Sequence, residues 1–227
     1  MPHNNAIVGV LKMTITSKLK MIQRVQRKRG RPRAYDHDIA LTSALNLFWE
    51  RGYAATSLDD LSRAMDMNRP SIYAAFGDKQ ALYKQALEHY RARVRTALKV
   101  VLDEGRPLRD ALRDFYERAI EMYLSGESSG RGCFIIGTAL TESVTNPELR
   151  ASLAEGFRGL DRLLSLRIAL GKQRGEVDAD ANPEELGKVA SAMLYLLAIQ
   201  ARTGATRKSL RATMNAAVNS ICSRATA

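Results

Sequence analysis

Beyond residue 35, apolar residues recur every three or four positions along most of the chain, and they do not alternate as they would in strands. This spacing places side chains on one face of an α-helix. Breaks at Gly, Asn and Pro divide the pattern into segments. The sequence therefore predicts an all-α fold of about nine helices, at residues 36–51, 57–65, 68–76, 78–104, 108–124, 133–144, 146–170, 182–200 and 206–221, with loops at 125–132 and 171–181.

The segment 56–79, TSLDDLSRAMDMNRPSIYAAFGDK, contains two short helices joined by a tight turn. Either Thr56 or Ser57 provides the side-chain oxygen that caps the first helix. Asn68 is a favourable N-cap for the second helix, and Pro70 falls in its first turn, where a missing N–H costs little. Two such helices form a helix-turn-helix, whose second helix enters the major groove of DNA.

The second helix of this pair has two different faces. Ile72 and Phe76 lie four residues apart and are expected to pack inward. Four side chains are expected to point away from the core and toward DNA: Arg69, Ser71, Tyr73 and Ala75.

The two helices predicted at the end of the chain are strongly apolar. Between Val189 and Ile199 the first of them is apolar almost all round, so it must be covered on more than one side. Either the two helices complete the core of the subunit, or they form the face of a homodimer. The residues assigned to that homodimer face are Leu186, Val189, Ala190, Met193, Leu194, Leu197, Leu210, Met214, Ala217, Val218 and Ile221.

Positive charge is concentrated at one end of the chain. Residues 1–35 hold nine of the 35 Lys and Arg residues and no Asp or Glu, so the remainder is close to neutral. We expect this arm to be disordered and to reach a polyanion; the alternative is a solvated extension without a partner. Its Arg-Gly-Arg-Pro sequence resembles an AT-hook, which inserts arginine into an A·T-rich minor groove. Arg29, Arg31 and Arg33 are therefore candidate DNA-binding residues.

Residues 36–85 resemble the TetR/AcrR family of bacterial transcriptional repressors. The resemblance lies in the run ALNLFWERGYAATSL and in the ending SIYAAFGDK, where Tyr73, Phe76 and Lys79 are spaced three apart. The family commonly has Gly in the turn between the two helices, where this chain has Asp66. Aspartate tolerates a left-handed backbone better than most residues, so we expect the turn to survive.

The resemblance implies both a domain organisation and a function. A helix-turn-helix domain is expected over residues 36–82, and a helix that begins at residue 79 leads into a ligand-binding and dimerisation domain over residues 83–227. As in the family, a homodimer would bind a palindromic operator in double-stranded DNA and would be released by a small-molecule inducer. An alternative function is that of an architectural protein that needs no inducer and binds DNA through its AT-hook-like arm.

The position of each residue in the motif suggests its role at DNA. Tyr73 is expected to donate its hydroxyl to a phosphate, the alternative being a core aromatic. Arg69 is the candidate base reader, because a guanidinium binds the O6/N7 edge of guanine with two hydrogen bonds; a phosphate contact is the alternative. Further DNA contacts are expected from Thr56, Ser57, Pro70, Ser71, Ala75 and Lys79.

An inducer pocket is expected among aromatic residues of the C-terminal domain, at Tyr90, Phe115, Tyr116, Tyr123, Phe134 and Phe157. Cys133 heads the apolar run CFIIGTAL in the same region. A redox sensor would need an exposed thiol with a low pKa. A small buried core residue is the other interpretation of Cys133.

No pattern for enzyme chemistry is found. The sequence has no Gly-rich phosphate loop, no nucleophile elbow and no metal-spaced set of His and Cys. We therefore predict no catalytic residues, no metal and no cofactor. The two cysteines and the absence of an apolar run of about 20 residues favour a cytoplasmic, nucleoid-associated protein without a membrane partner.

Overall fold

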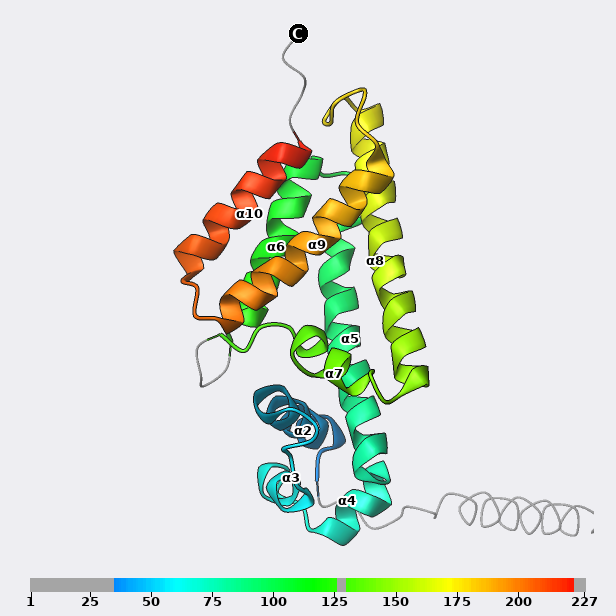
Figure 1. Ribbon diagram of the computed structural model, residues 1–227, viewed down its shortest axis with the longest axis vertical. Helices are drawn as coiled ribbons and strands as arrows, with labels where there is room; N and C mark the ends of the chain where they lie inside the picture. The colour runs from blue at the N-terminus through cyan, green and yellow to red at the C-terminus, as the bar shows by residue number, and fades with distance from the viewer. Residues whose placement is uncertain (1–34, 126–129, 223–227) are drawn as a thin grey trace, which may run out of the picture. The chain divides into compact units, whose positions relative to one another are not determined.

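The computed structural model describes residues 35–125 and 130–222, which fold as helices joined by short loops (Figure 1). Within this part of the chain there are nine α-helices, one π-helix and no strand, which confirms the all-α prediction. The predicted arm, with Arg29, Arg31 and Arg33, lies outside the described residues. No helix in the described ranges is both long and apolar enough to span a bilayer.

The first three helices are α2 (His37–Arg51), α3 (Leu58–Ala64) and α4 (Arg69–Phe76). Of the two caps proposed for α3, Ser57 is the correct one, and Asn68 caps α4 as predicted. Both cap side chains accept a hydrogen bond from a backbone N–H of the first turn, which has no partner inside the helix. The three helices form the expected helix-turn-helix unit at the lower end of Figure 1.

A long helix, α5 (Lys79–Val101), follows α4 directly, and its N-cap is Asp78, the first residue of the segment predicted at 78–104. It packs against α2 near its start and against the next helix of the chain further along. The predicted domain boundary at residues 82 and 83 therefore falls within a continuous helix. The remaining elements are α6 (Leu108–Tyr123), η1 (Ile135–Ala139), α7 (Leu140–Glu142), α8 (Pro147–Gln173), α9 (Pro183–Arg202) and α10 (Arg207–Ile221).

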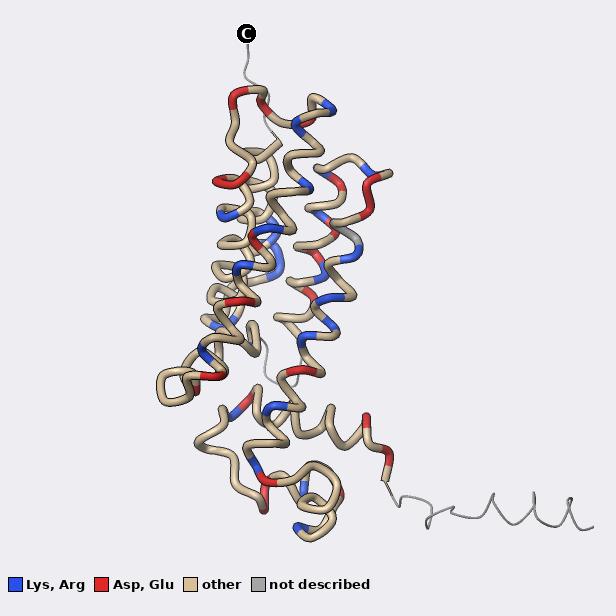
Figure 2. Tube along the Cα trace, turned by 90° about the vertical axis from the view of Figure 1, so that its right-hand side faces the viewer, with Lys and Arg blue, Asp and Glu red and all other residues tan. Residues whose placement is uncertain are grey.

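Helices α8 and α9 lie antiparallel and pack along each other, while α10 rests on α6 and α9 (Figure 1). Gly187 permits the close approach of α9 to α8, since a Cβ there would lie 2.1 Å from the Ser165 hydroxyl oxygen. Figure 2 shows that acidic and basic residues are scattered along the described chain among uncharged ones. The core combines many aliphatic side chains with buried aromatic ones, of which Trp49, Tyr90 and Tyr116 are the largest, and the charged side chains lie mostly on its outside.

Two predicted segments differ from the structure. Residues 133–144 do not form one regular helix, because the chain makes the π-helix η1 and then the single turn α7. The loop predicted to start at Gly171 is wrong as well, since α8 continues to Gln173. Gly171 is buried inside that helix, where a Cβ would lie 2.7 Å from the Leu108 side chain. This glycine provides close packing rather than a helix end.

The structure also corrects most of the predicted homodimer face. Helices α9 and α10 pack against α6 and α8 of the same subunit, so their main apolar stripes complete the core. Of the assigned residues, Leu186 and Met193 are half-buried, and Val189 is 51% exposed. The others are buried within the subunit: Ala190, Leu194, Leu197, Leu210, Met214, Ala217, Val218 and Ile221.

Candidate DNA-binding site

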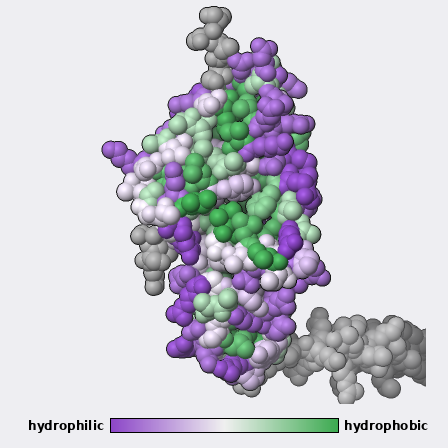
Figure 3. Space-filling view, in the orientation of Figure 1, coloured by the Kyte–Doolittle hydropathy of each residue, from purple (hydrophilic) through white to green (hydrophobic). Residues whose placement is uncertain are grey.

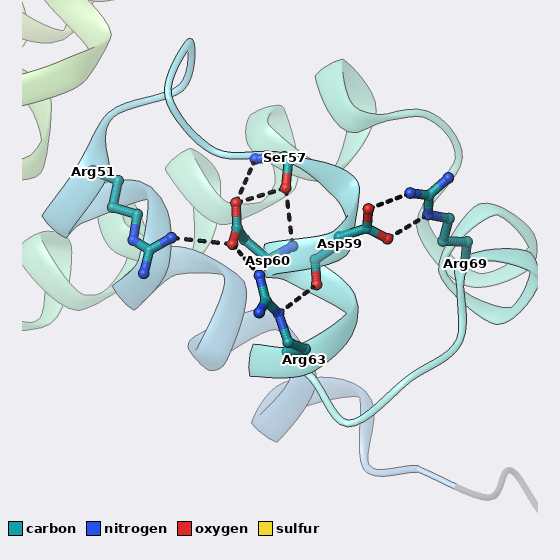
Figure 4. Close-up of polar contacts among 6 residues, drawn as sticks. All are labelled: Arg51, Ser57, Asp59, Asp60, Arg63 and Arg69. Carbon is teal, nitrogen blue, oxygen red and sulfur yellow. Dashed lines mark hydrogen bonds and ion pairs between the residues drawn. The ribbon is translucent and has the colours of Figure 1, made fainter.

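Helix α3 is held by a network centred on the Asp60 carboxylate (Figure 4). The Ser57 backbone N–H and hydroxyl both donate to one carboxylate oxygen, at 3.1 and 2.6 Å. Arg63 and Arg51 lie 2.7 and 3.1 Å from the other oxygen, and Arg51 comes from α2. The hydrogen bonds from Ser57, with the two arginines adding to them, lower the pKa of Asp60 to about 2. The network therefore fixes the start of α3 and ties it to α2.

The turn between α3 and α4 forms as expected with an aspartate in place of the usual glycine. Asp66 has φ of 51°, in the left-handed region. The Ser62 hydroxyl donates to the Met67 carbonyl at 2.6 Å, which satisfies a backbone group of the turn. The geometry of the helix-turn-helix is thus preserved.

Helix α4 has the two faces expected from its sequence. Ile72 and Phe76 are buried, at 0% and 3% exposure, against the rest of the unit. The Tyr73 side chain points outward and is 49% exposed, so its interpretation as a core aromatic is wrong. The Arg69 side chain is 54% exposed. These two residues, one turn apart, stand on the open face of the recognition helix.

The Arg69 side chain is paired with a carboxylate of the preceding helix. Its Nε donates to Asp59 Oδ1 at 2.8 Å, and its Nη2 contacts the second carboxylate oxygen in a bidentate ion pair (Figure 4). This hydrogen-bonded carboxylate raises the pKa of the Arg69 guanidinium. Sequence reasoning missed Asp59 because the two residues are ten positions apart and belong to different helices. No local spacing rule connects them.

The other residues predicted to contact DNA differ in how exposed their side chains are and in the bonds they already make. Thr56 is fully buried, and its hydroxyl donates to the Gly52 carbonyl at 2.6 Å. The expectation that its side chain contacts DNA is therefore wrong. Ser57 is exposed but is engaged in the capping box. The Lys79 ammonium lies 4.3 Å from the centre of the Tyr53 ring, and burial lowers its pKa. Pro70 is exposed, while Ser71 and Ala75 are half-buried.

The helices beyond the helix-turn-helix line an apolar, partly open cavity of about 290 Å³. Of the six predicted pocket residues, Tyr90, Tyr123 and Phe157 line it. The other three lie elsewhere. Phe115 and Tyr116 pack against each other, with the Tyr116 hydroxyl donating to the Ala190 carbonyl, and Phe134 packs among Trp49, Tyr83 and Tyr90. Lining residues that the sequence did not suggest include Arg91, Val94, Leu160, Leu194 and Tyr195.

Cys133 also lines this cavity. Its sulfur lies 3.1 Å from the Tyr90 hydroxyl, and burial raises the pKa of the thiol. A reactive thiol needs the opposite environment, exposed and with a lowered pKa. The interpretation of Cys133 as a buried core residue therefore fits its surroundings better than a role as redox sensor.

A buried arginine connects the cavity segment to the helix-turn-helix. Arg131 Nη1 donates to Asn46 Oδ1 at 2.8 Å, and its Nη2 donates to the Ser125 hydroxyl at 2.9 Å. The Trp49 indole N–H in turn donates to the Arg131 carbonyl at 3.2 Å. Asn46 and Trp49 belong to α2, so a residue two positions from Cys133 bonds directly to the helix-turn-helix unit.

Two family profiles match this chain. The profile described as "Bacterial regulatory proteins, tetR family" matches residues 40–86, which span α2 to the first turns of α5. The profile described as "Tetracyclin repressor-like, C-terminal domain" matches residues 107–217. Together they cover the helix-turn-helix and helices α6 to α10, and most of α5 lies between the two matches.

Known proteins resemble the chain over most of its length. It is 31% identical over 189 residues to the HTH-type transcriptional repressor ComR of Escherichia coli (strain K12). The aligned residues cover 83% of this chain and 90% of ComR. It is 34% identical, with a TM-score of 0.74, to a cysteine mutant of the TetR family transcriptional regulator CifR in complex with 26bp double-strand operator DNA. That match covers 85% of this chain and 100% of the other. The chain therefore belongs to the tetR family of bacterial regulatory proteins, and it is a DNA-binding transcriptional regulator rather than an enzyme.

Proposed function

We propose that this protein is a repressor that binds a palindromic operator as a homodimer and is released from it by a small-molecule inducer. The observation that carries the proposal is the open face of α4, where Arg69 and Tyr73 stand exposed on a helix whose opposite face is buried. A recognition helix needs this division between a packed face and a free one. The similarity to CifR, whose structure contains operator DNA, supports the same role here.

At the operator, we assign different DNA contacts to the residues of α4 and to residues outside it. The Tyr73 hydroxyl and the backbone near Ser57 bind phosphates and set the position of the helix. Arg69 reads a guanine, and the small surfaces of Pro70, Ser71 and Ala75 allow close approach to the groove. Lys79 adds a positive charge beside the phosphates. Arg29, Arg31 and Arg33 of the arm bind the neighbouring minor groove.

A second copy of the chain covers an apolar patch on α8 and α9. We define the apolar patch as Leu166, Val189, Leu196 and Ile199, which are 69%, 51%, 41% and 50% exposed. Apolar side chains gather on the face where α9 crosses in front of the other helices (Figure 3). An exposed patch of this kind marks an interaction surface, and a two-fold axis would bring it against itself. It replaces the homodimer face predicted from the buried stripes.

The apolar cavity is the site we assign to the inducer. It lies against α5, which carries Tyr90 and Val94 in its wall and begins at Lys79 beside α4. A ligand that displaces Tyr90 or Cys133 would also disturb contacts of α2, because the Tyr90 ring packs on Trp49 at 5.0 Å and Arg131, two positions before Cys133, bonds to Asn46. An inducer with higher affinity for the shifted conformer would weaken operator binding by shifting the population.

Selection from a random pool of duplex DNA by the full-length protein tests this function. We expect an enriched inverted repeat whose half-sites lie about 10 base pairs apart, or a multiple of that, because two recognition helices of a dimer enter successive major grooves. Failure to enrich any sequence would contradict the proposal, as would a single half-site bound by one chain. Enrichment of A·T-rich DNA without an inverted repeat would indicate the architectural alternative.

A further inference from the structure

The pairing of Arg69 with Asp59 constrains which part of the arginine can reach DNA. A guanidinium group is planar and offers two bidentate edges, one formed by Nε and one Nη, the other by the two Nη atoms. Asp59 occupies the first edge, through Nε and Nη2 (Figure 4). Nη1 makes no hydrogen bond within the described part of the chain. The edge that remains open is the one that can bind guanine O6 and N7 end-on.

The carboxylate that holds Arg69 is itself firmly placed. Asp59 lies in the first turn of α3, directly before Asp60, whose carboxylate closes the capping box and bonds to arginines on either side. Asp59 therefore sits on a helix end that is tied to α2 by side-chain bonds. The pair also bridges the two helices of the helix-turn-helix, since Arg69 opens α4.

Stability does not explain this ion pair. Both side chains are more than half exposed, at 54% for Arg69 and 63% for Asp59. Ion pairs at such positions contribute little to folding, because water and salt screen them. Its main physical effect is to restrict a long side chain that otherwise samples many rotamers, and so to reduce the entropy that binding would cost.

We propose that Asp59 is a positioning residue that holds Arg69 with its Nη1/Nη2 edge toward the major groove, and so determines the preference for guanine at one base pair of each half-site. The proposal rests on the operator-binding function proposed above. Asp59 acts through Arg69 and does not itself bind DNA. A negative charge near the phosphates lowers overall affinity, so its contribution is to selectivity between bases.

A double-mutant cycle on the selected operator tests this proposal. Wild type, Asp59→Asn, Arg69→Ala and the double variant are titrated against the operator and against versions with each base pair replaced. The base pair read by Arg69 is the one at which Arg69→Ala abolishes discrimination. We expect Asp59→Asn to reduce discrimination at that pair about 3- to 10-fold, and to leave discrimination unchanged when Arg69 is already alanine.

Glu148→Gln is the matched control, because Glu148 is an exposed acid in the first turn of α8 that also pairs with a basic side chain, Lys84. It is expected to leave every discrimination ratio unchanged. A change of affinity in Asp59→Asn that is the same for every sequence and leaves discrimination at that pair intact would overturn the proposal. So would an effect of Asp59→Asn on discrimination in the Arg69→Ala background, which would show that Asp59 reads the base itself. If wild type selects an operator but Asp59→Asn discriminates normally, this inference alone fails. If wild type selects no sequence, the proposed function fails with it.

Discussion

The guanidinium of Arg131 lies over the ring of Trp49, 3.8 Å from its centre, and the Trp49 indole N–H donates to the carbonyl of the same arginine. The two residues therefore bind each other through both side chain and backbone. Trp49 is fully buried in α2, and Arg131 belongs to the segment that leads to Cys133 at the apolar cavity. This contact links the segment before Cys133 to the helix-turn-helix, beside the direct packing of the cavity residue Tyr90 on the Trp49 ring at 5.0 Å.

Arg131→Gln tests how much this link contributes to folding. The variant loses the cation–π contact and the geometry of the bonds to Asn46 and Ser125, so we expect the free energy of unfolding to fall by about 1–3 kcal/mol. Urea denaturation measures the change. Arg118→Gln, at an exposed position on α6, is the control and should change stability by less than about 0.5 kcal/mol. Equal stability of the two variants would contradict the role given to Arg131.

Ser57→Ala tests the cap that holds α3 in place. Ser57 Oγ accepts the Asp60 backbone N–H at 3.1 Å, and alanine leaves that N–H without its partner. We expect a loss of about 1 kcal/mol in the free energy of unfolding, measured by urea denaturation. Ser57→Thr keeps the hydroxyl and should recover most of the loss. If alanine and threonine behave alike, the capping box does not stabilise α3 as described.

The contacts of the Asp60 carboxylate should make the folding stability of the protein depend on pH. Its pKa is about 2 in the folded protein, against 3.8 ordinarily, so the charged form is favoured by folding. The stabilisation is present above about pH 4 and is lost as the pH falls through 2. Asp60→Asn should therefore lower the urea midpoint at pH 7, with a difference from wild type that shrinks between pH 4 and 2. A difference that stays constant over this range would contradict the assignment.

Ile199→Asp tests the apolar patch as a contact between two copies. In the proposed homodimer each aspartate would be buried in the interface without a charged partner. We expect the dissociation constant of the homodimer to rise about 30-fold or more, as measured by sedimentation equilibrium. Val144→Asp is the control, because Val144 is 68% exposed but lies outside the patch. A dimer unaffected by Ile199→Asp would place the interface elsewhere.

Local sequence rules predicted the helices and their beginnings well, because each depends on residues only a few positions apart. The spacing of apolar residues and the caps Ser57 and Asn68 are of this kind, and both caps are confirmed. The segments predicted to begin at residues 78 and 206 are capped by those residues, Asp78 and Thr206. The orientation of α4 followed from the same reasoning, since Ile72 and Phe76 define its buried face.

Features that depend on distant contacts could not be predicted in this way. Gly171 was interpreted as a helix end because nothing near it in sequence reveals the Leu108 side chain against which it packs. The stripes of α9 and α10 looked like an interface because periodicity does not distinguish a face covered by the same subunit from one covered by a second copy. The pairing of Asp59 with Arg69 and the lining of the cavity are likewise properties of the folded chain.

Operator binding by the exposed face of α4 is tested by the affinity of the double variant Arg69→Ala, Tyr73→Ala for the selected operator. Both side chains are exposed and alanine favours helices, so the thermal unfolding temperature should not fall. We expect operator binding to weaken about 100-fold or more at a fixed salt concentration. Arg158→Ala, at an exposed arginine on α8, should bind as wild type does. A double variant that folds normally and binds the operator within threefold of wild type would contradict the account.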